Sequence, residues 1–86
     1  MTAQNQAIAF LHITLSSHAS NDLDAFKQIV LSLDSVTQIY HVSGPTDYII
    51  RVETADNSSL ECIINQLTEI ITLQRVQASI VYSQLK

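Results

Sequence analysis

Apolar residues fall in short blocks along this chain, and the spacing within each block predicts a strand or a helix. Blocks rich in β-branched and aromatic residues are expected to be strands: residues 7–15, 36–43, 48–54 and 75–83. Blocks that repeat their apolar residues at helical spacing are expected to be helices: residues 20–33 and 58–72. The chain therefore reads strand, helix, strand, strand, helix, strand.

Polar residues mark where the two helices are expected to begin. Asn21, Asp22 and Asp24 offer N-cap candidates and negative charge to the first turn of the first helix. Ser58 and Glu61 fit a capping box, in which the serine caps the helix and the glutamate reaches back to it. The second helix has the clearest apolar stripe in the chain: Leu60, Ile63, Ile64, Leu67 and Ile71.

The only glycine and the only proline stand side by side at the centre of the chain, as Gly44 and Pro45. Proline presets the φ angle that a turn needs, and glycine relieves the steric limit beside it. Because the connection is short, the flanking strands are expected to form an antiparallel hairpin. This turn would present backbone N–H groups, the Thr46 hydroxyl and the Asp47 carboxylate at one edge of a sheet. We interpret it as the candidate functional loop.

The order of the elements predicts an α+β fold. Two β-α-β units joined by a hairpin (βαββαβ) give the ferredoxin-like arrangement, a four-stranded antiparallel sheet with two helices on one face. The opposite face has no helix to cover it, although the first strand is apolar on both of its faces. Candidates for this open face are Ile8, Phe10, Ile39, Ile49 and Val81. We expect a second copy of the chain to bury them, so that the protein dimerises through its sheet.

Composition favours a single domain that hides part of its surface. The chain has 86 residues, enough for one domain over 1–86 with its core over about residues 7–83. Hydrophobic residues make up 47% of the chain and charged residues only 14%, whereas charged residues are about a quarter of a typical domain. Because small domains normally cover their surface with charge, this shortage favours burial against another subunit.

Charge and targeting signals exclude several classes of function. The net charge is −4 and the basic residues do not cluster, so no direct binding of nucleic acid is expected. The chain has no basic amphipathic helix, no apolar run near the ~18 residues of a membrane span and no signal-peptide pattern over residues 1–6. We therefore expect no membrane association. A single cysteine, Cys62, fits a cytoplasmic location.

The spacing of histidine, cysteine and glycine residues gives little support for metal binding or catalysis. His12, His18 and His41 lack the spacing of metal ligands, and Cys62 has no partner cysteine, so no metal is expected. Cys62 is expected to be a buried small hydrophobic residue on the second helix. With one glycine the chain cannot build a P-loop, a nucleophile elbow or a dinucleotide fingerprint. We therefore expect no cofactor and no catalytic residue.

The central segment 42–52, which reads VSGPTDYIIRV, resembles the effector-binding domain of the Lrp/AsnC family, also called the RAM domain. That domain shows V-[ST]-G-x-x-D-Y-L-L-x-V at this point. The resemblance covers about residues 7–83. The chain is similar to the stand-alone form of the family, because the first strand begins too early for the helix-turn-helix that most members carry. Pro45 and Thr46 depart from the family's pattern, and the common P-G-V turn is missing around residues 72–74. These departures leave the identity of the ligand open.

The resemblance implies how this chain assembles and what it binds. Family members pair through their sheets into dimers, and the dimers form rings, commonly octamers. A small effector, typically an amino acid, binds at dimer–dimer contacts near the matching loop. The candidate ligand-binding residues are Gly44, Pro45, Thr46 and Asp47 of the loop and Ser79 of the last strand. Loop N–H groups would receive a carboxylate and Asp47 an ammonium; the alternative is that Asp47 caps its own turn and Ser79 is an ordinary sheet hydroxyl.

Three functions remain open. The first is an oligomeric, non-enzymatic module that binds an amino acid and is linked to transcription regulation, with a DNA-binding Lrp/AsnC regulator as a candidate partner. The second is a cofactor-free oxygenase on the same ferredoxin-like dimer, with His12 or His41 as its acid–base group. The third is a scaffold that binds no ligand. We favour the first.

Overall fold

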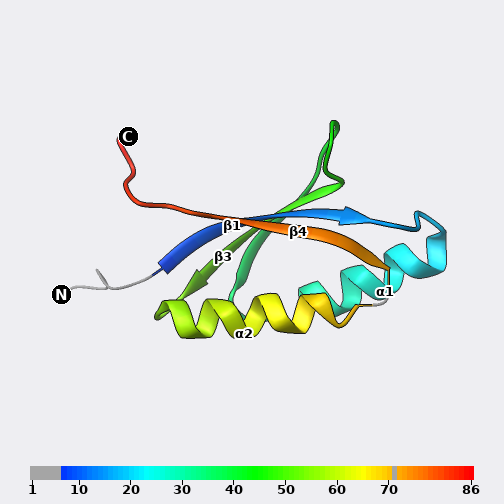
Figure 1. The fold of residues 1–86 in the computed structure, drawn as a ribbon, viewed down its shortest axis with the longest axis horizontal. Helices are drawn as coiled ribbons and strands as arrows, with labels where there is room; N and C mark the ends of the chain where they lie inside the picture. Colours follow the sequence, from blue (N-terminus) through cyan, green and yellow to red (C-terminus); the bar gives the residue numbers. More distant parts are fainter. Residues whose placement is uncertain (1–6, 71) are drawn as a thin grey trace.

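The elements follow the expected order in the computed structural model, which describes residues 7–70 and 72–86 (Figure 1). The strands are β1 (Ala7–Leu15), β2 (Val36–His41), β3 (Tyr48–Thr54) and β4 (Leu73–Ile80), and the helices are α1 (Ser20–Leu31) and α2 (Asn57–Thr68). The strands form one antiparallel sheet in the order β2-β3-β1-β4. The predicted α+β, ferredoxin-like fold is confirmed.

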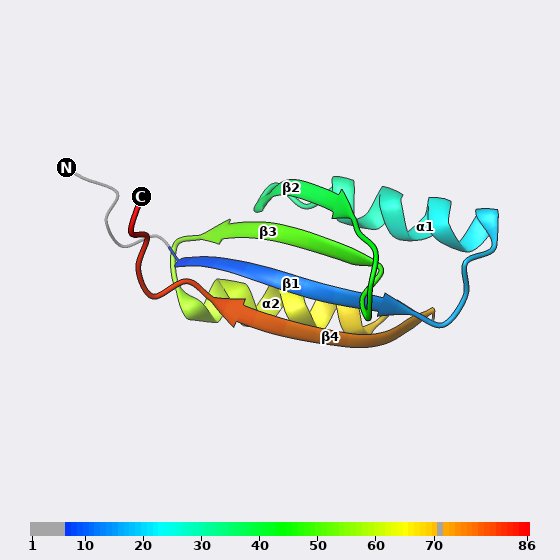
Figure 2. The same cartoon turned by 90° about the horizontal axis from the view of Figure 1, so that it is seen from above.

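Two layers make up the molecule. Both helices lie against the same face of the sheet, and none of the described elements covers the opposite face (Figures 1 and 2). The central strands β1 and β3 follow this division residue by residue, because buried side chains alternate with half-buried ones from Ala9 to Leu15 and from Tyr48 to Thr54. The half-buried set forms the centre of the face that carries no helix, which we call the open face.

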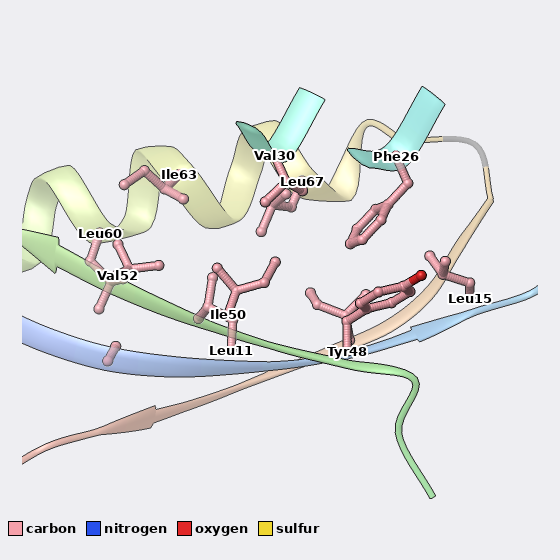
Figure 3. Packing of buried hydrophobic residues seen from close by; sticks show 12 residues of the cluster. Leu11, Leu15, Phe26, Val30, Tyr48, Ile50, Val52, Leu60, Ile63 and Leu67 are labelled. Carbon is pink, nitrogen blue, oxygen red and sulfur yellow. The ribbon is translucent and has the colours of Figure 1, made fainter. Parts of the chain in front are cut away.

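The core lies between the sheet and the helices (Figure 3). Its buried residues come from both layers: Ala9, Leu11, Ile13 and Leu15 of β1, Tyr48, Ile50 and Val52 of β3, Phe26 and Val30 of α1, and Leu60, Ile63 and Leu67 of α2. The aromatic rings of Phe26 and Tyr48 lie 5.1 Å apart between centroids, which places the start of β3 firmly against α1. This packing fixes the end of the loop that precedes β3.

The prediction for the open face is right for Ile8, Phe10 and Ile49 and wrong for Ile39. Ile8, Phe10 and Ile49 are half-buried on β1 and β3, facing away from the helices. Ile39 is paired with Ile50 and packs against the core, so it faces the helices. A register shift between Val36 and Gln38 accompanies this pairing, and a shift of one residue moves a side chain to the other face.

The predicted cap of the second helix is also wrong. The helix begins at Asn57, and Asp56 is its N-cap, with Oδ1 accepting the Ser59 N–H at 2.8 Å. Ser58 lies exposed in the first turn. Asp competes well with Ser for this position, and the two candidates stand only two residues apart.

The boundaries of other elements differ slightly from the prediction. Helix α1 ends at Leu31, with Ala19 in the N-cap position and no side-chain cap. Strand β2 ends at His41, and β4 starts two residues earlier and ends three residues earlier than expected. The predictions for residues 1–6 and for Ile71 fall outside the described residues. No helix in the described ranges is both long and apolar enough to cross a bilayer.

Cys62 was expected to be buried and is exposed. The buried stripe of α2 contains Leu60, Ile63 and Leu67. Because a helix advances about 100° per residue, the position beside Ile63 points away from that stripe. The prediction for Cys62 is therefore corrected.

Candidate functional site

The loop between β2 and β3 is closed by a backbone hydrogen bond and turned by its glycine. The Val42 N–H donates to the Asp47 carbonyl at 3.0 Å. Gly44 has φ +107°, a value that residues with a side chain rarely adopt. The loop rises from the open face, away from the helices (Figure 1), and passes over the end of β1 (Figure 2). There the Thr14 hydroxyl donates to the Pro45 carbonyl at 3.5 Å.

Asp47 joins this loop to the end of β1 through its backbone and its side chain. Its N–H donates to the Ile13 carbonyl at 2.8 Å, which extends the pairing of β3 with β1 by one residue. Its Oδ2 accepts the N–H of Leu15 at 2.8 Å. The carboxylate thus contacts the neighbouring strand, in a hydrogen bond that spans 32 residues of sequence.

His18 supplies the second partner of the Asp47 carboxylate. It lies in the connection between β1 and α1, and its Nε2 is 3.1 Å from Asp47 Oδ1. The Asp47 side chain is 24% exposed and the His18 side chain 58% exposed, so both are accessible from solvent. From the sequence, His18 is considered only as a metal ligand, and that role is not expected. Its place just after β1, together with the pairing of β1 with β3, is the signal that could have found this contact.

The surroundings of Asp47 favour its charged form. The Leu15 N–H lowers the pKa of the Asp47 carboxyl, partial burial opposes this, and His18 and then His41 lower the pKa further. At neutral pH the loop therefore carries a fixed negative charge at the rim of the open face.

The remaining loop residues offer backbone groups more than side chains. Gly44 and Pro45 are exposed, and Thr46 is half-buried. Among the described residues, the N–H groups of Gly44 and Thr46 have no protein acceptor. A polar ligand at this loop would therefore meet free donors beside the Asp47 carboxylate.

Ser79 is not part of the same cluster within one chain. It pairs with Phe10 on β1, and its Oγ lies 3.3 Å from His12 Nε2 on the open face. The loop contacts Thr14, four residues further along β1, which at about 3.3 Å per residue is roughly 13 Å away. The structure brings Asp47 together with Gly44, Pro45 and Thr46 but leaves Ser79 apart.

Other polar groups on the open face are paired within the chain. Arg51 donates to Glu53 and, at 2.8 Å, to the Thr37 hydroxyl, so its ion pair with Glu53 is formed inside one subunit. A hollow of about 320 Å³ beside Arg51 is lined by Ile8, Phe10, Val81, Ser83 and Gln84. Within the described ranges, no three His, Cys, Asp or Glu side chains gather as a metal site would require.

Comparison with known proteins gives a family and several relatives. A model of the Lrp/AsnC ligand binding domain matches residues 8–86. The glutamate uptake regulatory protein of Zymomonas mobilis is 29% identical over 77 residues, which are 90% of this chain and 47% of that protein.

Solved structures agree on the fold. A crystal structure of an AsnC family transcriptional regulator from Agrobacterium tumefaciens has a TM-score of 0.85 at 24% identity and covers 95% of this chain and 54% of that one. A transcriptional regulator from Neisseria meningitidis in complex with L-Met has a TM-score of 0.81 at 22% identity and covers 93% of this chain and 52% of that one.

This chain spans about half the length of these relatives. The match to the family model nevertheless runs through every described strand and helix, from β1 to the C-terminal residues. The chain therefore belongs to the Lrp/AsnC ligand binding domain family.

Proposed function

We propose that this chain is an oligomeric module that binds a small amino acid-like ligand at the loop of residues 44–47 and takes part in transcription regulation without catalysing a reaction. The observation that carries the proposal is the ionised, accessible carboxylate of Asp47 beside the N–H groups of Gly44 and Thr46, which have no acceptor among the described residues. An amino acid carries one ammonium and one carboxylate. The loop offers a complementary group for each within a few residues.

The ligand's two charged groups have distinct partners in this proposal. Asp47 accepts hydrogen bonds from the ammonium, which it can do because a carboxylate has more acceptor positions than its two present partners fill. The N–H groups of Gly44 and Thr46 receive the carboxylate. Pro45 holds the turn between them and has no N–H of its own.

A second copy of the chain completes the site. The open face is apolar at Ile8, Phe10 and Ile49 and has no helix over it, which supports a homodimer formed through the sheet. Ser79 lies too far from the loop of its own subunit to share a small ligand with it. We therefore place the Ser79 of one subunit near the loop of another in a higher, ring-like assembly.

The link to regulation rests on the relatives. The relative from Zymomonas mobilis is named as an uptake regulatory protein, and those from Agrobacterium tumefaciens and Neisseria meningitidis as transcriptional regulators, one of them in complex with L-Met. In our proposal the ligand binds one assembled form more tightly and shifts the population towards it. A DNA-binding regulator of the same family is the partner that would respond to this change in assembly.

A thermal-shift screen against the twenty amino acids, with light scattering on the same samples, tests the proposal. We expect a few amino acids to raise the unfolding temperature and change the mean mass. Their N-acetyl and methyl-ester derivatives should have no effect, because each lacks one of the two charged groups. Stabilisation by no amino acid, with a constant mass, would contradict ligand binding and favour a scaffold.

A further inference from the structure

We propose that the imidazole of His18 competes with the ligand's ammonium for the Asp47 carboxylate, so that ligand affinity weakens as the pH falls. The inference rests on the proposed binding of an amino acid at the loop. It goes further by assigning His18 to the site and by giving the site a dependence on pH. Asp47 would then pair with either of two cations, the protonated His18 side chain or the ammonium of the ligand.

The His18 imidazole lies against the same carboxylate that the ammonium of the ligand would contact. The Leu15 N–H at the end of β1 donates to Asp47 Oδ2, whereas His18 Nε2 lies 3.1 Å from the other oxygen, Oδ1. The His18 side chain is 58% exposed and the Asp47 side chain 24% exposed, so His18 stands on the solvent side of the carboxylate. A ligand ammonium that reaches Asp47 from solvent therefore shares the carboxylate with His18, which already contacts Oδ1.

Charge decides which cation Asp47 holds. Histidine side chains ordinarily gain a proton between about pH 8 and pH 5, and a protonated His18 both occupies Oδ1 and repels an ammonium. The Asp47 carboxyl itself does not titrate in this range, because the Leu15 N–H lowers its pKa. The α-ammonium of an amino acid also keeps its charge there. The pH dependence in this interval therefore reports on histidine.

Other charged groups around Asp47 have separate positions. His41 of β2 stacks on Tyr48, with 4.8 Å between ring centroids, and acts on Asp47 through space without a hydrogen bond. Asp22 of α1 accepts the Ser17 hydroxyl at 2.5 Å. Arg75 of β4 pairs with Thr14 in the sheet. Among the described histidines, only His18 contacts the carboxylate.

Calorimetric titration at pH 5.5, 6.5 and 8.0 tests the inference, with L-methionine or whichever amino acid gives the largest thermal shift. For the wild-type chain we expect the dissociation constant to be about two- to fivefold larger at pH 5.5 than at pH 8.0, the range typical of one accessible ion pair. His18→Gln should remove most of this change, leaving the smaller through-space effect of His41, and should bind more tightly at pH 5.5. The double variant H12Q/H41Q, which keeps only His18, should retain most of the change.

A ligand-free measurement separates this inference from the proposed function. Followed by carboxyl ¹³C NMR, the pKa of Asp47 should be higher in His18→Gln than in the wild-type chain, because one of the groups that lower it is gone. Unchanged Asp47 titration, or equal pH dependence of binding in wild type and His18→Gln, would overturn the inference. Binding of no amino acid at any pH overturns the proposed function, and the inference with it, even if the Asp47 pKa moves as expected.

Discussion

The backbone N–H of Leu15 donates to Asp47 Oδ2 at 2.8 Å, and this bond connects the last residue of β1 to the loop that enters β3. The two strands are already neighbours, since Ile13 pairs with Tyr48. Past that point the strands would separate, and the side chain of Asp47 replaces the next backbone partner. The Asp47 carboxylate therefore adds a side-chain contact to the backbone hydrogen bonds that hold the candidate ligand-binding loop on β1.

Replacing Asp47 by Asn should make stability less sensitive to acid. The folded-state pKa of Asp47 is lowered, so its contribution to stability is complete above the unfolded value near 4 and disappears as the pH falls through the folded value. We expect Asp47→Asn to unfold about 1 kcal/mol more easily than wild type at pH 7, as for one hydrogen bond to a partly exposed carboxylate. Urea unfolding at pH 7 and pH 2.5 measures this difference.

The difference between the two chains should be smaller at pH 2.5 than at pH 7, because the Asp47 carboxylate takes up a proton as the pH falls. Asp34→Asn, at an exposed position between α1 and β2, is the matched control and should behave as wild type at both pH values. A deficit of equal size in Asp47→Asn at pH 7 and pH 2.5 would show that ionisation of Asp47 is not what stabilises the loop.

Gly44→Ala should destabilise the chain through its backbone alone. The φ angle of Gly44 is +107°, and a Cβ built there would meet no atom within 4 Å. The expected cost is thus conformational and on the order of 1 kcal/mol. Thermal unfolding measures it, with Ser43→Ala in the same exposed loop as the control. A Gly44→Ala chain as stable as wild type would mean that the loop adopts another turn.

Asp56→Ala should weaken α2, and Ser58→Ala should not. The Asp56 carboxylate accepts the Ser59 N–H at 2.8 Å, whereas Ser58, two residues after Asp56, lies exposed. Loss of a side-chain N-cap should lower the unfolding temperature of a domain of this size by several degrees. Differential scanning calorimetry on the two variants checks the assignment, and the opposite order of effects would restore the capping box predicted from the sequence.

Ile49→Lys should break the assembly without unfolding the subunit. Ile49 is half-buried at the centre of the open face, paired with His12 and Tyr40, where a charged side chain reaches solvent only if no second copy lies over it. Sedimentation velocity at micromolar concentration should change from dimer or larger to monomer. Ile29→Lys, on the exposed side of α1, is the control and should leave the mass unchanged. A wild-type monomer would contradict the predicted dimer.

The sequence predicted the fold well where the pattern is local and strongly periodic. The stripe of α2 and the Gly44–Pro45 reversal each had a single consistent interpretation, and the βαββαβ order followed from them. Side chains whose environment depends on register were predicted less well. Ile39 faces the helices instead of the open face, and Cys62 is exposed beside the buried Ile63, because the pairing of β2 and the rotation of α2 decide which way each side chain points.

The candidate site was predicted only in part, for a similar reason. The motif located Asp47, because its position next to the turn is fixed along the chain. Leu15 and His18 were missed as its partners, since they are 32 and 29 residues away and approach it only through the pairing of β1 with β3. The distance between Ser79 and the loop likewise follows from strand register and not from residue type.

Calorimetric titration of an amino acid into Asp47→Ala tests the central claim most directly. The probe is the amino acid that stabilises the wild-type chain most in the thermal-shift screen, and Asp34→Ala, which also removes one loop carboxylate, serves as the control. Removal of a charge-assisted partner should weaken binding about tenfold or more in Asp47→Ala and leave Asp34→Ala unchanged. Equal affinity in wild type and a folded Asp47→Ala chain would contradict the account.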